Sequence, residues 1–217
     1  MHVVLKGTDR EFEADLLHPN GLFAAPMPAD AWGQPYELRW QTHEGKTLQH
    51  GDAYSYGLCL GELDMHLFCE GRHWKIFDHL GAHLRNMGGV DGTQFAVWAP
   101  NAKRVSVIGD FNMWDGRMHP MRNRMESGIW EIFIPGVGPQ THYKFEIIGP
   151  HGQLFNKSDP FAFFSQHGPS TASLTWDYKR YQWSDSAWMG ERRARDPYHG
   201  PMSIYEVHLG SWKRGDG

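Results

Sequence analysis

Four stretches in the middle of the chain alternate apolar and polar residues with a period of two. They are TQFAVWAP (93–100), KRVSVIG (103–109), GIWEIFIPG (128–136) and HYKFEII (142–148). Short strands of this kind, separated by Gly, Pro and Asn turns, predict a β-sandwich. In the third stretch, Glu131 and Phe133 are predicted to lie opposite the apolar Trp130, Ile132 and Ile134. In the fourth, the apolar set faces the core, so Lys144 is predicted to point outwards.

A repeat precedes this region. Residues 20–56 align without a gap on residues 127–163, at an offset of 107 residues. The identities are Gly21 with Gly128, Pro28 with Pro135, Tyr36 with Tyr143, Gly45 with Gly152, and Asp52 with Asp159. Chance similarity is the alternative, but the matches fall on turn residues and on a strand-starting Tyr, so we predict two β modules in tandem. The first has no counterpart of 93–100, and we expect that the chain begins inside a module.

The segments outside the two modules have different patterns. LGELDMHLFCEGRHWKIFDHLGAH (60–83) predicts a helix and a short connector, with Leu63, Leu67 and Phe68 on one stripe and a stop at Gly71. Residues 176–201 are polar without a clear period and predict a linker. MSIYEVHLGSW (202–212) is apolar and β-branched and predicts a strand. A buried type of strand with so little chain after it suggests a C-terminal cut.

Composition excludes several classes of protein. The 217 residues carry a net charge of -4, and no run of Lys and Arg exceeds two residues, so a nucleic-acid partner is not expected. No apolar stretch approaches the roughly 20 residues of a membrane span, and no signal peptide is apparent, so no membrane association is expected. Only two cysteines, Cys59 and Cys69, are present. Free thiols fit a reducing compartment, and we predict a cytoplasmic protein.

Candidate catalytic and metal-binding residues are few. Glu206 and His208 would share one face of the last predicted strand, but acid–base work needs a pocket and further groups. His79 and His83 are four residues apart, and His66 and His73 lie near Cys69 in sequence, without the tight spacing of zinc ligands. We therefore expect no catalytic residue, no metal and no cofactor.

The loop GDFNMWDG (109–116) places Trp114 among polar turn residues. A flat ring beside the outward Lys144 suits a sugar, which offers C–H faces for stacking and hydroxyls for hydrogen bonds. The 10 tryptophans of the chain also suit such surfaces. The alternative is a Trp folded over the edge of the sandwich beside a solvated Lys, and the residue types alone favour neither.

The stretches FAVWAPNAKRVSVIGDFNMWDG, GIWEIFIPG, HYKFEI and KSDPFAF resemble the family-48 carbohydrate-binding module. The resemblance implies an immunoglobulin-like β-sandwich that binds α-1,4-glucans, with Trp114 and Lys144 in contact with the glucan. The most sugar-competent members of this family carry a further Trp in the next hairpin, which here contains Leu154 and Phe155. That stacking ring is absent or replaced by Phe155. In the first repeat, Glu37 and Gly7 occupy the positions of Lys144 and Trp114, so we expect that module to pack rather than bind.

DHLGAH (78–83), FNMWDGRMHPMR (111–122) and PMSIYEVHLGSWKR (201–214) extend the resemblance to the bacterial glycogen branching enzymes of glycoside hydrolase family 13. In such an enzyme, 202–212 would be the first strand of a (β/α)8 barrel, which takes about 250 residues and is otherwise absent. The family's catalytic carboxylates have no matching positions here. The resemblance thus implies a fragment that is inactive alone and whose partners are α-1,4-glucan (glycogen and malto-oligosaccharides) and its own missing barrel.

The expected fold is mainly β, with tandem immunoglobulin-like sandwiches of which the first is truncated, followed by the first barrel strand. The predicted segments are a β module at 1–59, a helical connector at 60–88, the sandwich at 89–175, a linker at 176–201 and the start of a barrel at 202–217. Alternatives remain: an isoamylase-type debranching enzyme, a trehalose-forming hydrolase, a non-enzymatic glycogen-targeting module, or a spacer with a decayed site. YEVHLGSW and the repeat favour the branching enzymes.

Overall fold

A computed structural model of the chain describes residues 1–42, 44–196 and 198–212. The chain forms two compact units, Met1–Tyr178 and Lys179–Gly217. In the part of the chain that the structure describes, no helix combines the length and the apolar character that crossing a membrane requires.

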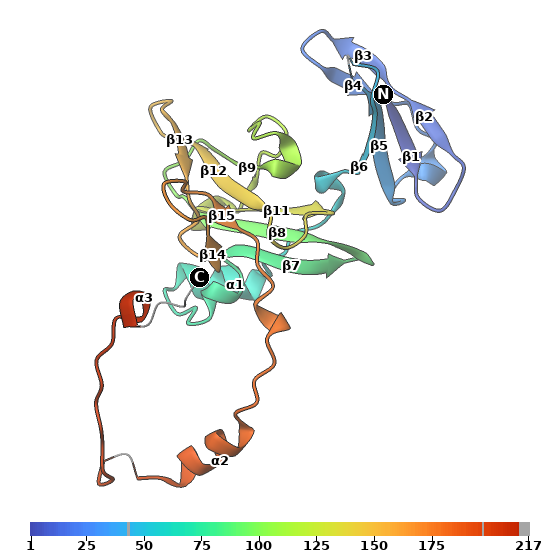
Figure 1. Cartoon of the computed structure of the whole chain (residues 1–217). Helices are drawn as coiled ribbons and strands as arrows, with labels where there is room; N and C mark the ends of the chain where they lie inside the picture. The colour runs from blue at the N-terminus through green and yellow to red at the C-terminus, as the bar shows by residue number, and fades with distance from the viewer. Residues whose placement is uncertain (43, 197, 213–217) are drawn as a thin grey trace. The chain divides into compact units, whose positions relative to one another are not determined.

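The first unit begins with a four-stranded antiparallel sheet in the order β2-β1-β5-β6 (Figure 1). Its strands are β1 (His2–Leu5), β2 (Glu11–Glu13), β5 (Tyr36–Gln41) and β6 (Thr47–Gly51). A separate hairpin joins β3 (Asp15–His18) to β4 (Leu22–Ala24), and short 3-10 turns occur at Ala29–Ala31 and Ala53–Ser55. This region is therefore mainly β, as expected, and consists of an open sheet and a hairpin; the predicted tandem of sandwich modules is not confirmed.

The rest of the first unit is a two-layer β structure (Figure 1). One layer has the order β10-β11-β8-β7, and the other has the order β13-β12-β15-β14 with β9 also paired to β12. The strands of the first layer are β7 (Gly81–Met87), β8 (Val90–Trp98), β10 (Arg122–Asn123) and β11 (Ile129–Pro135). Those of the second are β9 (Arg104–Gly109), β12 (His142–Ile148), β13 (Leu154–Lys157), β14 (Phe164–Ser165) and β15 (Ser173–Leu174).

The core lies between these two layers. Phe95 of β8 and Ile132 of β11 pack in one cluster with Val107 of β9 and Phe145 of β12, and all four are buried. All four strands predicted from the period-two pattern are present. In β12, Tyr143 and Phe145 are buried while Lys144 between them is half-buried, so the predicted alternation is confirmed.

Both faces of β11 are buried. Glu131 and Phe133 lie opposite Trp130, Ile132 and Ile134, as predicted, but each is only 1% exposed. A second apolar cluster covers this face, in which Leu60 and Leu80 of the connector pack with Ile129 of β11. A period-two pattern identifies a strand, but it does not show whether a second layer covers the polar face.

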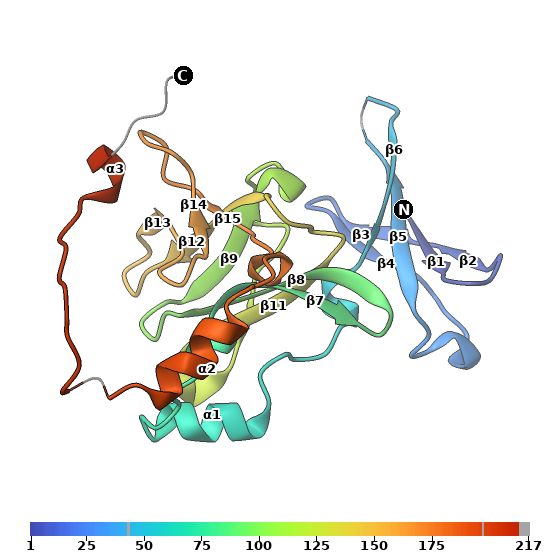
Figure 2. The ribbon, with the colours of Figure 1, turned by 60° about the horizontal axis from the view of Figure 1, so that its bottom comes forward.

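The connector contains the predicted helix but ends earlier than predicted, before β7. Its helix α1 (Glu62–Cys69) is present and Gly71 follows it with a φ of 71°, as expected for a helix stop. Met65 and Phe68 pack on the second cluster, but Leu63 is 69% exposed and does not belong to the packed stripe. A 3-10 turn at Ile76–Asp78 follows, and the chain then enters β7 (Figure 2).

Residues 81–87 were assigned to the helical connector, but they form β7, which pairs with β8. The two strands are joined by Gly88 and Gly89, whose φ angles are 59° and 84°. Two consecutive residues with positive φ define the tight turn of a β-hairpin. The Gly-Gly pair is therefore the sequence signal that the prediction overlooked.

The repeat at an offset of 107 residues coincides with repeated strand pairing. Leu38 faces His50 in the β5–β6 hairpin, and the residues 107 positions later, Phe145 and Lys157, face one another in β12–β13. A shared hydrogen bond accompanies it: the Tyr36 hydroxyl donates to Asp52, and the hydroxyl of Tyr143 donates to Asp159 Oδ2 at 2.6 Å. Leu16–Phe23 and Asn123–Trp130 correspond in the same way.

One buried carboxylate joins the connector to the sandwich. Glu131 accepts hydrogen bonds at Oε2 from the backbone N–H groups of Cys59 (2.8 Å) and Leu60 (3.0 Å). Its Oε1 pairs with the Arg124 guanidinium, which also donates to the Leu60 carbonyl at 2.8 Å. The charge of Glu131 is thus matched by one cation and two backbone donors, as a buried ion requires.

The second unit contains two short helices in the part of it that the structure describes. It contains α2 (Ser186–Ala194) and α3 (Leu209–Trp212), and a 3-10 turn spans Tyr178–Arg180 at the junction of the units. Residues 202–208 have no regular structure, so the strand predicted at 202–212 is not confirmed. A strand needs a neighbour for its backbone N–H and C=O groups, and none is paired with this segment among the described residues.

Replacing Glu131 by Ala should leave the Arg124 charge and two backbone donors without a partner. We expect the free energy of unfolding to fall by about 3–5 kcal/mol, as for breaking a buried ion pair. Urea unfolding followed by circular dichroism measures it, with the exposed Glu126→Ala as the control, expected within about 0.5 kcal/mol of the original protein. A loss below about 1 kcal/mol for Glu131→Ala would show that this carboxylate does not hold the connector.

Candidate functional site

Trp114 lies on a loop that leaves the end of β9. After Gly109 the chain forms a 3-10 turn at Asp110–Asn112, and Met113 and Trp114 then adopt positive φ angles of 54° and 60°. The Trp114 ring is 39% exposed, and its Nε1 donates to Asp110 Oδ1 at 3.2 Å. Two consecutive non-glycine residues in the left-handed region are strained, and such strain concentrates at functional sites.

Asn112 fixes the shape of this loop. Its side chain is buried, its Oδ1 accepts from Gly109 N at 2.9 Å, and its Nδ2 donates to the Val107 carbonyl at 2.9 Å. The same Nδ2 lies 2.9 Å from His119 Nδ1. The amide therefore bridges the end of β9 and the returning chain. Asn112 is not among the residues predicted from the sequence. Its signal was its residue type, because Asn side chains hydrogen-bond to nearby backbone and stabilise turns.

Lys144 and the Trp114 loop lie on the same face of the second layer. Lys144 faces Ile108 in the β12–β9 pair, and its Nζ donates to Thr171 Oγ1 at 2.8 Å. Glu146, two residues further along β12, shares its face. A Cβ atom added at Gly116 would collide with the Glu146 carboxylate, so the loop that carries Trp114 rests on this face.

Phe155 lies on the other face. It stands opposite Ile147 in the β12–β13 pair, and Ile147 packs on the sandwich core. Directly opposed residues of an antiparallel pair point to the same side, so Phe155 points away from the face of Lys144. The neighbouring Leu154, which is 60% exposed, stands opposite Ile148 and shares the face of Lys144. The structure thus brings Trp114 and Lys144 to one face and leaves Phe155 out.

Ion pairs surround this face. Arg104 pairs with Glu146, and His142 Nδ1 lies 3.0 Å from Asp110 Oδ2. Each links β12 to β9 or to the turn after it. The face therefore combines one exposed ring with a rim of polar groups, which can stack on an apolar surface and hydrogen-bond to hydroxyls.

The corresponding positions of the first repeat differ. Glu37 forms an ion pair with Lys6 Nζ at 3.1 Å and accepts from Gln49 Nε2 at 2.8 Å, and these contacts lower the pKa of the Glu37 carboxyl. Gly7, which the offset of 107 residues matches to Trp114, has a φ of 73°. The pairing of β1 follows another offset, because Val4 faces Glu37 in β1–β5 whereas Ile108 faces Lys144 in β9–β12. The cation of the second repeat is thus replaced by Glu37, but Gly7 is not the structural counterpart of Trp114.

The other candidate residues are separated. Glu206 and His208 are exposed in the second unit, where His208 Nδ1 lies 2.9 Å from Ser211 Oγ, and no strand gives them a common face. His83 is buried beside the Leu80 carbonyl, and burial lowers its pKa. His73 and His79, in contrast, lie close together in the connector, where both contact the Asp64 carboxylate.

The two-layer region matches a known family model. Residues 79–162 match the model of carbohydrate-binding module 48, described as the isoamylase N-terminal domain. We refer to residues 79–162 as the matched segment. It begins just before β7, which agrees with the pairing of that strand into the sandwich.

The whole chain has longer relatives. It is 50% identical over 214 residues to the 1,4-alpha-glucan branching enzyme GlgB of Paramagnetospirillum magneticum, which covers 98% of this chain and 28% of that protein. The GlgB of Rubrobacter xylanophilus is 50% identical over 203 residues, or 93% of this chain and 27% of that protein. The chain therefore resembles the N-terminal regions of bacterial branching enzymes. It spans about a quarter of the length of these relatives.

A solved structure is similar at a lower level. The apo pullulanase of Paenibacillus barengoltzii aligns with 46% of this chain and 14% of its own, at 23% identity and a TM-score of 0.38.

Removal of the Asn112 side chain should loosen the loop that carries Trp114. Asn112→Ala leaves Gly109 N–H and the Val107 carbonyl without their partner, and we expect a loss of about 1–3 kcal/mol in stability. The near-ultraviolet circular dichroism of Trp114 should also weaken. The exposed Asn123→Ala is the control. Unchanged stability and an unchanged spectrum in Asn112→Ala would contradict the anchoring role.

Acid should weaken the same region through His119. Burial lowers the pKa of His119 from its ordinary 6.5 to about 4, so the unfolded chain binds a proton more readily between these pH values. The stabilisation is complete above about pH 6.5 and is lost as the pH falls towards 4, with about 2 kcal/mol lost at pH 5. Protonated His119 Nδ1 also no longer accepts from Asn112.

The measurement is urea unfolding at pH 7 and pH 5 for the original chain and for His119→Gln. Burial raises the pKa of Asp159 to about 6, which acts in the opposite direction, but this group is present in both proteins. The difference between them thus isolates His119. Equal pH dependence in the two proteins would rule out its contribution.

Proposed function

We propose that this chain is the N-terminal, glucan-binding part of a 1,4-α-glucan branching enzyme, and that it holds α-1,4-glucan on the face of Trp114 and Lys144. The observation that carries the proposal is the common face: the Trp114 loop rests on Glu146, on the side of β12 that presents Lys144. The match to a carbohydrate-binding module and the identity with branching enzymes supply the class of ligand.

Binding would use both residues in different ways. The exposed Trp114 ring stacks on the C–H face of a glucose unit, and its anchored loop reduces the entropy lost on binding. An ammonium has three donors, and Lys144 directs one to Thr171, so its other donors reach sugar oxygens. Phe155 belongs to the other face and has no part in this site.

The transfer reaction would belong to the rest of the enzyme. A retaining enzyme of this kind forms a covalent glucosyl intermediate on one carboxylate, with a second group as acid and base. No such pair is assembled among the described residues, and we propose that this chain alone is inactive. By holding a glucan chain near the barrel, this part of the enzyme would raise the effective concentration of glucan at the barrel. We further propose that residues 202–212 become the first barrel strand once neighbouring strands pair with them, and that the protein is cytoplasmic.

The first 59 residues are proposed to be an incomplete copy of the sandwich. Support comes from pairing: β1-β5-β6 follows the order of β9-β12-β13, and β3–β4 has the register of β10–β11. Strands equivalent to β7 and β8 are not paired with them in the described chain. Leu16, Leu22 and Phe23, on the hairpin equivalent to β10–β11, are 57%, 60% and 37% exposed. With Glu37 in place of Lys144, this copy serves as a spacer rather than a binding unit.

The test is calorimetric titration of maltoheptaose into the purified chain. Trp114→Ala and Lys144→Ala should each weaken binding by about tenfold or more, the equivalent of about 1.4 kcal/mol. Two matched controls lie elsewhere: Trp32→Ala removes a 79% exposed Trp that follows the 3-10 turn Ala29–Ala31, and Phe155→Ala removes the ring on the other face. Both should bind as the original chain does.

Several outcomes would overturn the proposal. A folded original chain that binds no maltoheptaose would favour a spacer with a decayed site. Loss of binding in Phe155→Ala but not in Trp114→Ala would move the site to the other face. Circular dichroism of each variant separates lost binding from lost folding.

A further inference from the structure

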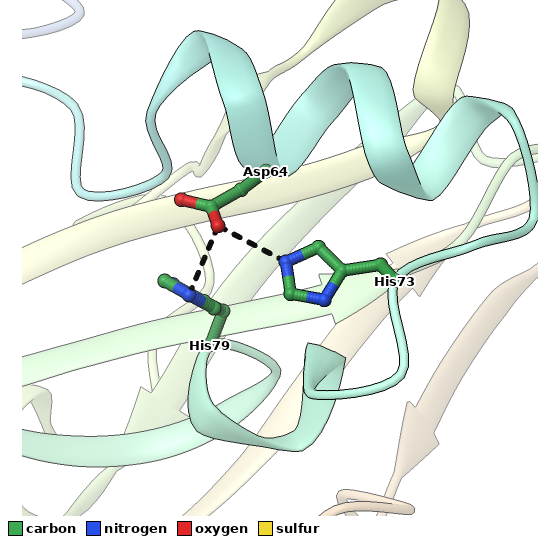
Figure 3. Close-up of side chains that lie close together, drawn as sticks. All are labelled: Asp64, His73 and His79. Carbon is green, nitrogen blue, oxygen red and sulfur yellow. Dashed lines mark hydrogen bonds and ion pairs between the residues drawn. The ribbon is translucent and has the colours of Figure 1, made fainter.

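Three side chains of the connector converge on one point (Figure 3). They are Asp64 of α1, His73 of the following loop and His79 at the end of the 3-10 turn Ile76–Asp78. Asp64 Oδ1 lies 3.0 Å from His73 Nε2 and 3.3 Å from His79 Nε2. The cluster is on the connector, away from the strand face that carries Trp114 and Lys144, and nothing in the proposed function uses it.

The geometry of these atoms matches a metal centre. In a tetrahedral site with metal–ligand bonds of about 2.0–2.2 Å, neighbouring ligand atoms stand about 3.3 Å apart. The two measured edges are 3.0 Å and 3.3 Å, and the three ligand atoms all lie within 4.8 Å of one another. A modest opening of the cluster would therefore admit an ion, with water at a fourth position.

The surroundings hold the ligands in place. The side chain of His73 is only 8% exposed, and those of His79 and Asp64 are 20% and 25% exposed. Asp64 Oδ2 accepts from Gly61 N at 3.1 Å, which leaves Oδ1 directed at the two rings. The backbone around the cluster packs on the sandwich through Phe68 and Ile76.

The ligand atoms of the site also suit a cation, since one carboxylate oxygen and two imidazole nitrogens converge there. Two imidazoles and one carboxylate favour zinc, nickel or copper over magnesium or calcium, which prefer oxygen ligands.

His79 sets the expected strength. Its Nδ1 is buried and has no hydrogen-bond partner in the described structure. Metal-bound histidines usually donate from the other ring nitrogen to a fixed acceptor, which orients the ring. The missing acceptor predicts weaker binding than in a structural zinc site with a complete outer shell.

We propose that Asp64, His73 and His79 form a binding site for one zinc-like divalent transition-metal ion, which ties α1 to the turn before β7. The sequence alone predicts no metal, because its histidines lack the tight spacing of zinc ligands and the ligands meet only in the fold. Bound metal links positions 64 and 79, and it stabilises the folded connector because the ligands converge only in the folded state.

The experiment uses the metal-stripped chain, titrated with ZnCl2 by calorimetry and with CoCl2 by visible absorption. One equivalent should bind, Co²⁺ should give the d–d bands of a four-coordinate site, and the Tm should rise with Zn²⁺. His73→Gln and His79→Gln should each weaken Zn²⁺ binding by about tenfold or more. His66→Gln, on the same helix with a side chain that is 66% exposed, is the matched control and should bind normally.

Other results would overturn the site. Zn²⁺ binding that survives both His73→Gln and His79→Gln would belong to other histidines of the chain. Absence of binding by the folded original chain would leave the cluster as an ion pair only. His79→Gln is the decisive variant, because His79 lies at the end of a short turn and is less buried than His73. The circular dichroism and the Tm of this variant without metal report whether the variant is folded.

Discussion

The buried Glu131 carboxylate is the constraint on which the arrangement of the first unit depends. It lies on β11, whose other face fills the sandwich core, and it binds the backbone at Cys59 and Leu60 through its oxygens. A buried charge that loses its partner destabilises the folded state strongly. Arg124 and the chain at 59–60 must therefore both remain in contact with Glu131. The connector, its apolar cluster and the Asp64 cluster follow from this attachment.

The candidate glucan face depends on a second buried polar group. Asn112 closes the turn after β9, and its hydrogen bonds hold Met113 and Trp114 in conformations that are unfavourable in isolation. The sandwich supplies the rigid strands, and the loop presents the ring. A ring fixed in this way loses little freedom on binding, so a small site suffices for a long, repetitive ligand such as a glucan.

The two repeats show how one framework can carry different surfaces. Each has a Tyr hydroxyl that donates to an Asp sixteen residues later, and this pair sets the same hairpin register in both. The residues that project outwards have diverged: Lys144 in one is Glu37 in the other. The Tyr–Asp hydrogen bonds accompany the strand pairing in both, whereas positions that point outwards change without cost to it.

The sequence by itself determined the four strands of the sandwich, the helix before it, the stop at Gly71 and the outward position of Lys144, because period and turn residues are local properties. Tertiary structure decided the rest. Burial of Glu131 depends on the connector that covers β11. The face on which Phe155 lies depends on its pairing with Ile147. Asp64, His73 and His79 meet because of the path of the loop between them. Residues 202–212 show the same limit, since an apolar pattern makes a strand only when another strand satisfies its backbone.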